Sequence, residues 1–171
     1  MEKNKTCCFS GHRQICDEHM IRLPESLSRL LDSLVKEGYR HFKTGGAIGF
    51  DTVAALKCLE LKNKYPELSL TLELCLPCKD QTLGWSEMEK SAYRFVLERA
   101  DKVSYVSDCY TKWCMYARNR RLVEGSDLCV AYLTDSKGGT SYTCSYAEEK
   151  GVKVINLYEH LITDNSTNNY K

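Results

Sequence analysis

The sequence lacks the features that mark membrane, secreted and polyanion-binding proteins. No apolar run approaches the roughly 18 residues that a membrane-spanning helix needs. The first apolar stretch is interrupted by Gly11, His12 and Arg13, so it is shorter than the ~7–15 apolar residues of a secretory signal. An excess of one charge is missing as well, because 24 basic and 23 acidic side chains leave a net charge of +1. We therefore expect a cytoplasmic protein without a membrane partner and without an overall field that attracts nucleic acid.

Internal repeats, low-complexity blocks and linkers are also missing. A chain of 171 residues is the size of one domain and is long enough to bury a core. Hydrophobic residues make up 43% of the chain and charged residues 27%, which is typical of a soluble globular protein. We predict a single domain over residues 1–160, followed by a polar C-terminal tail over residues 161–171.

Cysteine, in contrast, is abundant, with ten residues. A secreted disulfide framework places its cysteines in the loops of small chains that have little core. Here they lie inside apolar runs such as TCCF and LCVAYL, where cysteine behaves as a small buried hydrophobic residue. The pattern predicts that most of the ten are free thiols.

Short β-rich runs alternate with longer helical patterns, in which apolar residues recur three or four positions apart. Gly38, Gly125 and Gly151 each follow a helical segment at the position of a left-handed cap, and Pro24 suits a first helical turn. The predicted strands are 6–10, 39–44, 69–76, 102–106, 128–133 and 152–157, and the predicted helices are 24–37, 51–64, 86–100, 112–124 and 141–150.

This alternation is typical of an α/β protein. It predicts a single three-layer Rossmann-like domain with a mostly parallel sheet and helices on both faces. In such sheets, ligands bind at the carboxyl ends of the strands, near a topological switch point. Three loops of unusual composition follow predicted strands, at residues 10–13, 44–51 and 137–140. We predict that these loops converge on one pocket.

The loop that follows the second predicted strand reads KTGGAIGFD and matches neither the P-loop nor G-x-G-x-x-G. Gly45 and Gly46 remove the side chains that would keep a ligand from the backbone N–H groups, and the helix that follows favours an anion at its amino end. The two glycines are explained equally well by a tight turn that needs positive φ. Asp51 would repel a phosphate, so it either caps the helix or accepts hydrogen bonds from ribose hydroxyls.

The other two loops have related features. In SGHR, Gly11 permits a close approach, and His12 and Arg13 offer donors to a phosphate or a carbonyl, although such a pair is also typical of a solvated loop. In SKGGTSYT, two glycines and Thr140 precede a helix, and this threonine is alternatively a plain N-cap. Two Gly-Gly loops at corresponding ends of one sheet favour an anion site over two unrelated turns.

The helix predicted at residues 112–124 carries an amide on its apolar face. Asn119 is four residues after Met115 and three before Leu122, so it shares their face. A buried amide needs hydrogen-bond partners, so we predict that Asn119 braces the strand-end loops or contacts a ligand. The basic cluster beside it consists of Arg118, Arg120 and Arg121. We expect at least one of these arginines to be only a solvated surface residue.

Two cysteine pairs and a tryptophan carry weaker signals. Cys75 and Cys78 have redox spacing, but no helical pattern follows immediately to lower a thiol pKa. A zinc site would need a second pair of ligands, which Cys109 and Cys114 could supply, with nothing else in support. Trp85 is explained by stacking on a base or, at least equally well, by core packing.

Four segments together resemble the SLOG superfamily, which contains the DNA-processing protein DprA and the cytokinin-activating LOG enzymes. They are SGHR, TGGAIGFDTVAA, ARNRRLVEGSDLCVAYL and KGGTSYTCSYAEEKGVKVINL, in this order. The likeness is strongest to the YpsA-like branch and covers roughly residues 6–158. It implies a Rossmann-like fold whose strand-end loops bind a nucleotide or a nucleotide-derived ligand such as NAD, ADP-ribose or a nucleoside phosphate.

The resemblance also implies the ligand contacts. The LOG enzymes have a signature similar to P-G-G-x-G-T-x-x-E, in which the glutamate carries catalysis. When Thr140 is placed on the motif threonine, Thr143 stands where the glutamate belongs, and Glu148 and Glu149 lie a turn or more further along. The resemblance thus implies a phosphate cradle without LOG-type catalysis. The implied contacts are Gly11, His12, Arg13, Thr44, Gly45, Gly46, Ala47, Gly49, Asp51, Arg118, Asn119, Gly138, Gly139 and Thr140.

Three classes of function remain. We favour a module that binds or senses a small ligand containing ribose and phosphate. The alternative is a phosphoribohydrolase or another enzyme that cleaves an N-glycosidic bond, against which the missing glutamate counts. A DprA-like binder of single-stranded DNA would need a basic, aromatic-lined groove, and the balanced charge argues mildly against it. Self-association with a second copy of the chain stays open, and no metal site is expected.

Overall fold

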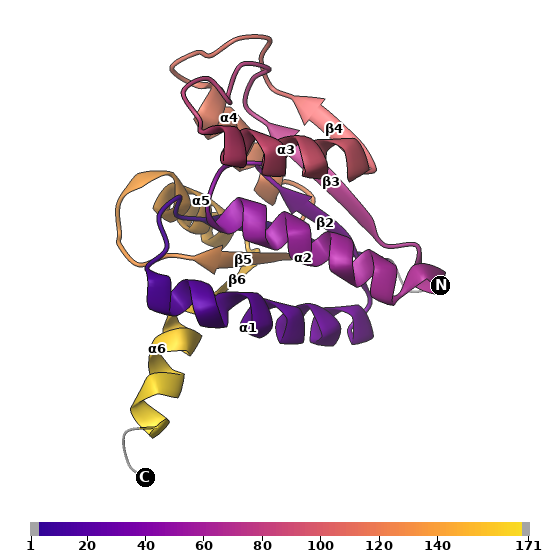
Figure 1. The fold of residues 1–171 in the computed structure, drawn as a ribbon, viewed down its shortest axis with the longest axis vertical. Helices are drawn as coiled ribbons and strands as arrows, with labels where there is room; N and C mark the ends of the chain where they lie inside the picture. Colours follow the sequence, from indigo (N-terminus) through magenta and orange to yellow (C-terminus); the bar gives the residue numbers. More distant parts are fainter. Residues whose placement is uncertain (1–3, 169–171) are drawn as a thin grey trace.

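The computed structural model describes residues 4–168 and contains a six-stranded sheet with helices packed against it (Figure 1). Each strand is followed by an α-helix, as the alternation predicts. The strands are β1 (Lys5–Gly11), β2 (Tyr39–Thr44), β3 (Thr71–Leu76), β4 (Lys102–Tyr105), β5 (Leu128–Tyr132) and β6 (Lys153–Asn156). The helices are α1 (Asp17–Lys36), α2 (Phe50–Lys64), α3 (Glu87–Arg99), α4 (Cys114–Val123), α5 (Gly138–Glu149) and α6 (Leu157–Asn168), with a short 3-10 helix at Pro66–Leu68.

The strands lie in the order β4-β3-β2-β1-β5-β6, and every neighbouring pair is parallel. The predicted Rossmann-like α/β fold is therefore confirmed. From β1 the chain adds strands in one direction as far as β4, and it then returns to place β5 on the other side of β1. The strand order reverses at this point, which opens a crevice at the carboxyl ends of the central strands.

Helices cover both faces of the sheet (Figure 1). α1 packs against α2 and α6, and α2 packs against α3, while α4 packs against α5 on the opposite face. β1 shows why both layers are needed. Phe9 belongs to the larger core, which includes residues of α1 and α2, and its neighbour Cys8 belongs to the smaller core, which includes residues of α4 and α5. Successive side chains of a strand point to opposite faces, and here both are fully buried.

All ten cysteines are free, which confirms that they are not a disulfide framework. Cys16 and Cys109 are exposed, and the others are buried. Cys8, Cys75 and Cys129 help to form the smaller core together with apolar residues of α4 and α5. The apolar residues around these cysteines in the sequence thus predicted their burial correctly.

Helix boundaries were predicted better at the carboxyl ends than at the amino ends. The predicted caps Gly38, Gly125 and Gly151 all have positive φ and follow α1, α4 and α5. Pro24, however, lies inside α1 and not in its first turn, so the expected boundary was wrong. Proline removes one helical N–H, but a fully buried face of α1 outweighs that loss because packing supplies most of a helix's stability. This face includes Leu23, Leu27 and Leu31.

Helix α6 was not predicted, and the polar tail expected from residue 161 begins inside it. Leu157 and Leu161 are buried, and Arg22 Nη1 donates to the Leu161 carbonyl at 3.0 Å. Asn156 Oδ1 accepts from the Tyr158 N–H at 3.2 Å, as the side chain of an N-cap residue does. This asparagine after the last strand is the sequence signal that could have revealed the helix. Residues 169–171 of the predicted tail lie outside the described part of the chain.

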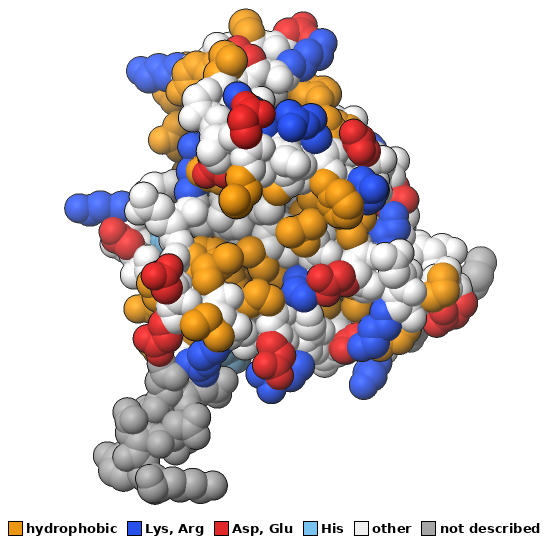
Figure 2. Space-filling view, viewed as in Figure 1, with side chains coloured by type: hydrophobic (Ala, Val, Ile, Leu, Met, Phe, Trp, Pro, Cys, Tyr) orange, Lys and Arg blue, Asp and Glu red, His pale blue; other side chains and the backbone are white. Residues whose placement is uncertain are grey.

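Within residues 4–168, no helix combines the length and the apolar character that crossing a bilayer requires. Figure 2 shows Lys and Arg side chains interspersed with Asp and Glu over the face that carries α1, α2 and α3. This mixture agrees with the net charge of +1. Attraction of a charged ligand therefore depends on a local cluster of side chains and not on the overall field.

Candidate functional site

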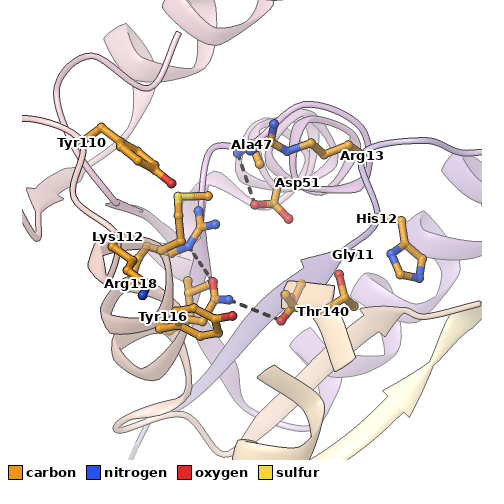
Figure 3. Close-up of a pocket in the computed structure, with 15 residues that line it drawn as sticks. Gly11, His12, Arg13, Ala47, Asp51, Tyr110, Lys112, Tyr116, Arg118 and Thr140 are labelled. Carbon is orange, nitrogen blue, oxygen red and sulfur yellow. Dashed lines mark hydrogen bonds between the residues drawn. The ribbon is translucent and has the colours of Figure 1, made fainter. Parts of the chain in front are cut away.

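The loops that follow β1, β2 and β5 meet at the carboxyl edge of the sheet, where they line a cavity of about 430 Å³ (Figure 3). Helix α4 and the segment before it supply the remaining wall. The predicted convergence of the three loops is therefore what the structure shows. The residues that line the cavity are Ser10, Gly11, His12, Arg13, Ala47, Asp51, Tyr110, Lys112, Met115, Tyr116, Arg118, Asn119, Leu122, Gly139 and Thr140.

His12 ties the loop after β1 to the end of β5. Its backbone N–H donates to the Tyr132 carbonyl at 3.2 Å, and its ring Nε2 accepts from the Thr134 N–H at 3.0 Å. A neutral imidazole that accepts at Nε2 carries its proton on Nδ1. His12 thus positions two loops with respect to each other and keeps one ring donor for a further partner.

The loop after β2 packs closely against the loop after β1. Gly49 has a φ of +81°, and a Cβ at this position would overlap the backbone carbonyl of Arg13. The Phe50 N–H at the start of α2 donates to the His12 carbonyl at 3.2 Å. The glycine is required by this backbone approach. The amino end of α2, expected to attract an anion, is partly occupied by protein.

Gly45 makes room for Arg118. A Cβ on Gly45 would overlap the Arg118 guanidinium and would lie 2.8 Å from Asp51 Oδ2. Arg118 is 6% exposed; its Nη1 donates to the Gly45 carbonyl at 2.6 Å and its Nε donates to Asn119 Oδ1 at 2.8 Å. A positive charge is thereby fixed in the cavity wall. The other two members of the basic cluster, Arg120 and Arg121, are exposed, and Arg120 Nε donates to the Tyr142 hydroxyl at 2.6 Å.

Asp51 does not cap its helix, so that alternative was wrong. The N-cap of α2 is Gly49, and no side chain forms a capping hydrogen bond at this end of the helix. Asp51 is 4% exposed, and its Oδ2 accepts from the Ala47 N–H at 3.2 Å. Burial raises the pKa of Asp51, while Arg118 and the loop N–H groups act in the opposite direction. Asp51 braces the 44–51 loop from inside and reaches the cavity with part of its side chain.

Gly46 turns away from the cavity. Its φ is +64°, and a Cβ would lie 2.6 Å from Leu76 Cδ2. Gln81 Nε2 donates to the Gly46 carbonyl at 3.1 Å. The tight-turn explanation therefore holds for this glycine. The predicted site residues that the structure does not place in the cavity lining are Thr44, Gly45, Gly46, Gly49 and Gly138.

The amino end of α5 faces the cavity. The helix begins at Gly138, so Thr140 lies in its first turn and is not the N-cap, which is Lys137. The first N–H groups of a helix have no intrahelical acceptor and give that end a partial positive charge. Gly139 lines the cavity, and within 4 Å a Cβ there would meet only Asn119 Nδ2, at 3.4 Å. The approach from the cavity to this helix end is therefore open.

Asn119 acts as the predicted brace. Its Nδ2 donates to the Gly139 carbonyl at 3.3 Å, and its Oδ1 accepts from Arg118, so it joins α4 to the start of α5. Thr143, which the sequence resemblance sets against the LOG glutamate, is fully buried, and its Oγ1 donates to the same Gly139 carbonyl at 2.8 Å. Its hydroxyl supports the first turn of α5 from within the protein.

Six residues of the cavity wall are not among the predicted contacts. Two of them, Ser10 and Leu122, adjoin predicted contacts, and the other four come from the segment before α4 and its first turns: Tyr110, Lys112, Met115 and Tyr116. Lys112 joins Arg13 and Arg118, so three cationic side chains and one carboxylate line the cavity. The mixture of aromatic and basic residues in the sequence YTKWCMY is the signal that could have identified these four.

The two cysteines with redox spacing, Cys75 and Cys78, are not arranged for thiol chemistry. Burial raises the pKa of the Cys75 thiol to about 11 and that of Cys78 to about 12, with the Glu73 and Asp80 carboxylates adding to these effects. At neutral pH both are therefore poor nucleophiles, which argues against the redox function that their spacing suggests. Among residues 4–168, no group of three or more His, Cys, Asp or Glu side chains could hold a metal ion.

Comparison with known sequences places the chain in a family. The YpsA family model, described as the YspA SLOG family, matches residues 11–165. The SPbeta prophage-derived protein YoqJ of Bacillus subtilis (strain 168) is 29% identical over 143 residues, which cover 76% of this chain and 82% of YoqJ. A UPF0398 protein of Bacillus thuringiensis (strain Al Hakam) is 27% identical over 143 residues, covering 82% of this chain and 76% of that protein.

Solved structures share the fold at low sequence identity. DNA processing protein A (DprA) from Streptococcus pneumoniae matches with a TM-score of 0.62 and 16% identity, over 88% of this chain and 49% of that one. DprA from Helicobacter pylori, whose structure concerns a single-stranded DNA binding mode, matches with a TM-score of 0.60 and 18% identity, over 88% of this chain and 63% of that one. The protein TM1055 matches with a TM-score of 0.56 and 17% identity, over 88% of this chain and 72% of that one.

Proposed function

Because the chain belongs to the YpsA family of SLOG proteins, we propose that it binds or senses a small nucleotide-derived ligand in the strand-end cavity. The ligand contains ribose and phosphate, and NAD, ADP-ribose and nucleoside phosphates are the candidates. The cavity volume of about 430 Å³ falls within the range of small-molecule sites, which spans roughly 300–1,000 Å³.

The observation that carries the proposal is the open amino end of α5 opposite three cationic side chains. Gly139 and Thr140 present the first turn of the helix to the cavity, and Arg13, Lys112 and Arg118 line the same space. Unpaired helix N–H groups and guanidinium groups are the donors that phosphate prefers. Arg118 is already held by Gly45 and Asn119, so its charge is positioned before a ligand arrives.

We propose binding without LOG-type cleavage. Breaking an N-glycosidic bond needs a carboxylate or a comparable group beside the ribose. Thr143 is buried, and its hydroxyl is engaged with the Gly139 carbonyl. Asp51 is the carboxylate that lines the cavity, and it is engaged with the Ala47 N–H. Neither arrangement supplies a free acid or base.

The test is to incubate the protein with nucleoside monophosphates and to measure melting temperature and base release on the same samples. We expect the melting temperature to rise, because a ligand at ~100 times its dissociation constant adds about 2.7 kcal/mol of stability. We expect no base release at ordinary enzyme speed, roughly 1 per second or faster. Turnover at that speed that disappears in Asp51→Asn would establish the enzyme alternative.

A second candidate function, binding of single-stranded DNA, is favoured by a row of four aromatic rings that runs from the start of α4 to α5. This aromatic row consists of Trp113, Tyr116, Tyr142 and Tyr146, with successive ring centroids 6.2, 5.0 and 6.3 Å apart. Arg120 Nε donates to the Tyr142 hydroxyl at 2.6 Å, and the Lys150 ammonium lies 5.3 Å from the Tyr146 ring centre. Interleaved aromatic and basic groups are what single-stranded nucleic acid stacks on.

Titration of a fluorescent oligothymidylate at several salt concentrations tests this candidate. Stacking predicts that Tyr142→Ala weakens binding about tenfold, while Tyr105→Ala, at an exposed tyrosine of the edge strand β4 outside the row, has no effect. Binding that is absent at low salt, or equal losses in both variants, would exclude the row as a DNA platform.

A further inference from the structure

A second cavity adjoins the first. It has a volume of about 740 Å³ and shares Arg13, Tyr110 and Met115 with the strand-end cavity. Figure 3 shows Arg13 and Tyr110 on the side of the first cavity that lies away from Thr140. The second cavity extends from these shared residues toward the 78–85 loop, where Asp80 and Trp85 line it. A ligand seated at α5 therefore has space to extend past Arg13.

The two cavities differ in chemistry. The first is lined by cationic side chains and by the start of α5, which suits a phosphate. Apart from the shared Arg13, the charged residues of the second are the carboxylates Asp80 and Glu89, which would repel a phosphate. The rest of its wall offers apolar and aromatic surface, which suits a flat ring; this surface includes Ile48, Leu83, Trp85, Tyr110 and Met115.

Asp80 lines this cavity beside Cys78, and its carboxylate adds to burial in raising the pKa of the Cys78 thiol. The Oδ1 atom of Asp80 is buried, and among the described residues it has no hydrogen-bond partner. Glu89, the other carboxylate, already accepts from the Ser86 N–H at 2.7 Å and serves the amino end of α3. A buried oxygen without a donor is unfavourable, so an N–H group of a ligand would stabilise it. Half-buried Trp85 is held by Tyr93 at a centroid distance of 5.6 Å.

We propose that the second cavity seats the nucleobase of the ligand, and that it selects a base with an exocyclic amino group. The base lies against Trp85 and donates an N–H to Asp80 Oδ1, while the phosphate lies at the start of α5 on the other side of Arg13. This assignment rests on the proposed function and adds the orientation of the ligand and the class of its base. Adenine, which carries an exocyclic amino group, is the base we expect.

Calorimetric titration with three ligands tests the assignment: AMP, purine riboside 5′-phosphate, which lacks the amino group, and ribose 5-phosphate, which lacks the base. For the wild type we expect AMP to bind about tenfold more tightly than purine riboside 5′-phosphate, the effect of one hydrogen bond to a charged group. Asp80→Leu should remove this preference and leave ribose 5-phosphate affinity within about twofold. The change removes both carboxylate oxygens, of which Oδ1 is buried without a partner, and we expect the fold to tolerate it, as the melting temperature of the ligand-free variant checks. Asp108→Asn, at an exposed carboxylate, is the control for lost negative charge.

Trp85 provides a second readout. The chain has two tryptophans, so in Trp113→Phe the fluorescence reports on Trp85 alone. We expect AMP to quench it and ribose 5-phosphate to leave it unchanged. If AMP and purine riboside 5′-phosphate bind equally to the wild type, or if Asp80→Leu keeps the preference, the base assignment is wrong although ribose 5-phosphate binding still supports the proposed function. If none of the three compounds binds, both proposals fail.

Discussion

The chain has two Gly-Gly loops at the same edge of its sheet, and the structure gives them different purposes. In the 44–51 loop, a Cβ on Gly45 would strike Arg118, and one on Gly46 would lie 2.6 Å from Leu76. In the 137–140 loop, Gly138 and Gly139 are exposed, and a Cβ on either has no contact closer than 3.4 Å. The first pair makes room for protein, whereas the second leaves room for a ligand.

This difference teaches that a glycine motif does not by itself identify a phosphate site. The 44–51 loop forms part of the cavity wall, because its glycines leave space for the Arg118 guanidinium and for the backbone of the loop after β1. The 137–140 loop contains the open helix end at which we expect the anion. Substitutions in the two loops should therefore separate folding from binding.

Gly45→Ala is expected to have the largest effect. The new methyl group overlaps Arg118, which must leave its contacts with the Gly45 carbonyl and Asn119. Overpacking of a buried site typically lowers the free energy of unfolding by about 1–3 kcal/mol, and we expect the upper end here. Urea denaturation gives this value, and a loss below 0.5 kcal/mol would show that Arg118 is not held as described. Binding of ribose 5-phosphate should be lost as well.

Gly139→Ala is the matched change in the other loop. Its Cβ would meet only Asn119 Nδ2 within 4 Å, at 3.4 Å, so the free energy of unfolding should stay within about 0.5 kcal/mol of the wild type. The methyl group stands in the approach to the helix N–H groups, so ribose 5-phosphate should bind about tenfold more weakly. Undiminished affinity would show that the phosphate does not use this helix end.

Asp51→Asn tests, through the pH dependence of the free energy of unfolding, whether the Asp51 carboxyl is buried inside the 44–51 loop. Because burial raises the pKa of Asp51 in the folded state, the native protein keeps a proton that the unfolded chain has released. Wild-type stability should therefore fall relative to the variant as pH rises above the ordinary aspartate value of 3.8, and the difference should level off above the folded pKa. Asp135→Asn, an exposed aspartate, controls for the lost charge. A stability difference that is constant from pH 3 to 8 would contradict this account.

The smallest effect is expected at the end of β3 and in the segment that follows it, where there is no glycine pair. Cys75 and Cys78 are almost fully buried, and their raised pKa values of about 11 and 12 leave little thiolate at pH 8. Cys75→Ser with Cys78→Ser should leave ligand affinity unchanged under both reducing and oxidising conditions. Titration with a thiol reagent should modify exposed Cys16 and Cys109 first. A redox-dependent affinity that the double variant abolishes would contradict this.

Much of the fold could be predicted because its signals are local. The alternation of strand and helix patterns, the apolar surroundings of cysteines such as Cys8 and Cys129, and the glycine caps all depend on neighbouring residues. The exceptions also have local reasons. Pro24 suggested that a helix starts there, but α1 begins earlier because its buried face stabilises it. The polar residues after Leu161 suggested a tail, but the buried Leu157 and Leu161 hold α6 against the protein.

The candidate site could be predicted only in outline. That three loops would meet follows from parallel topology, and Asn119 was identified because an amide on an apolar face needs partners. The inward direction of Arg118, the different purposes of the glycines and the second cavity near Asp80 depend on distances between segments far apart in the chain. No periodicity in the sequence encodes those distances.

The most direct test of the central claim is calorimetric titration of AMP into three proteins: wild type, Arg13→Met and Arg29→Met. Arg13 is exposed and lies where the two cavities meet, whereas Arg29 is exposed on α1, paired with Glu25 and outside both cavities. We predict that the wild type binds AMP, that Arg13→Met binds it at least tenfold more weakly through loss of a charged hydrogen bond, and that Arg29→Met matches the wild type. Equal affinities in all three proteins, or no binding by the wild type, would contradict the account.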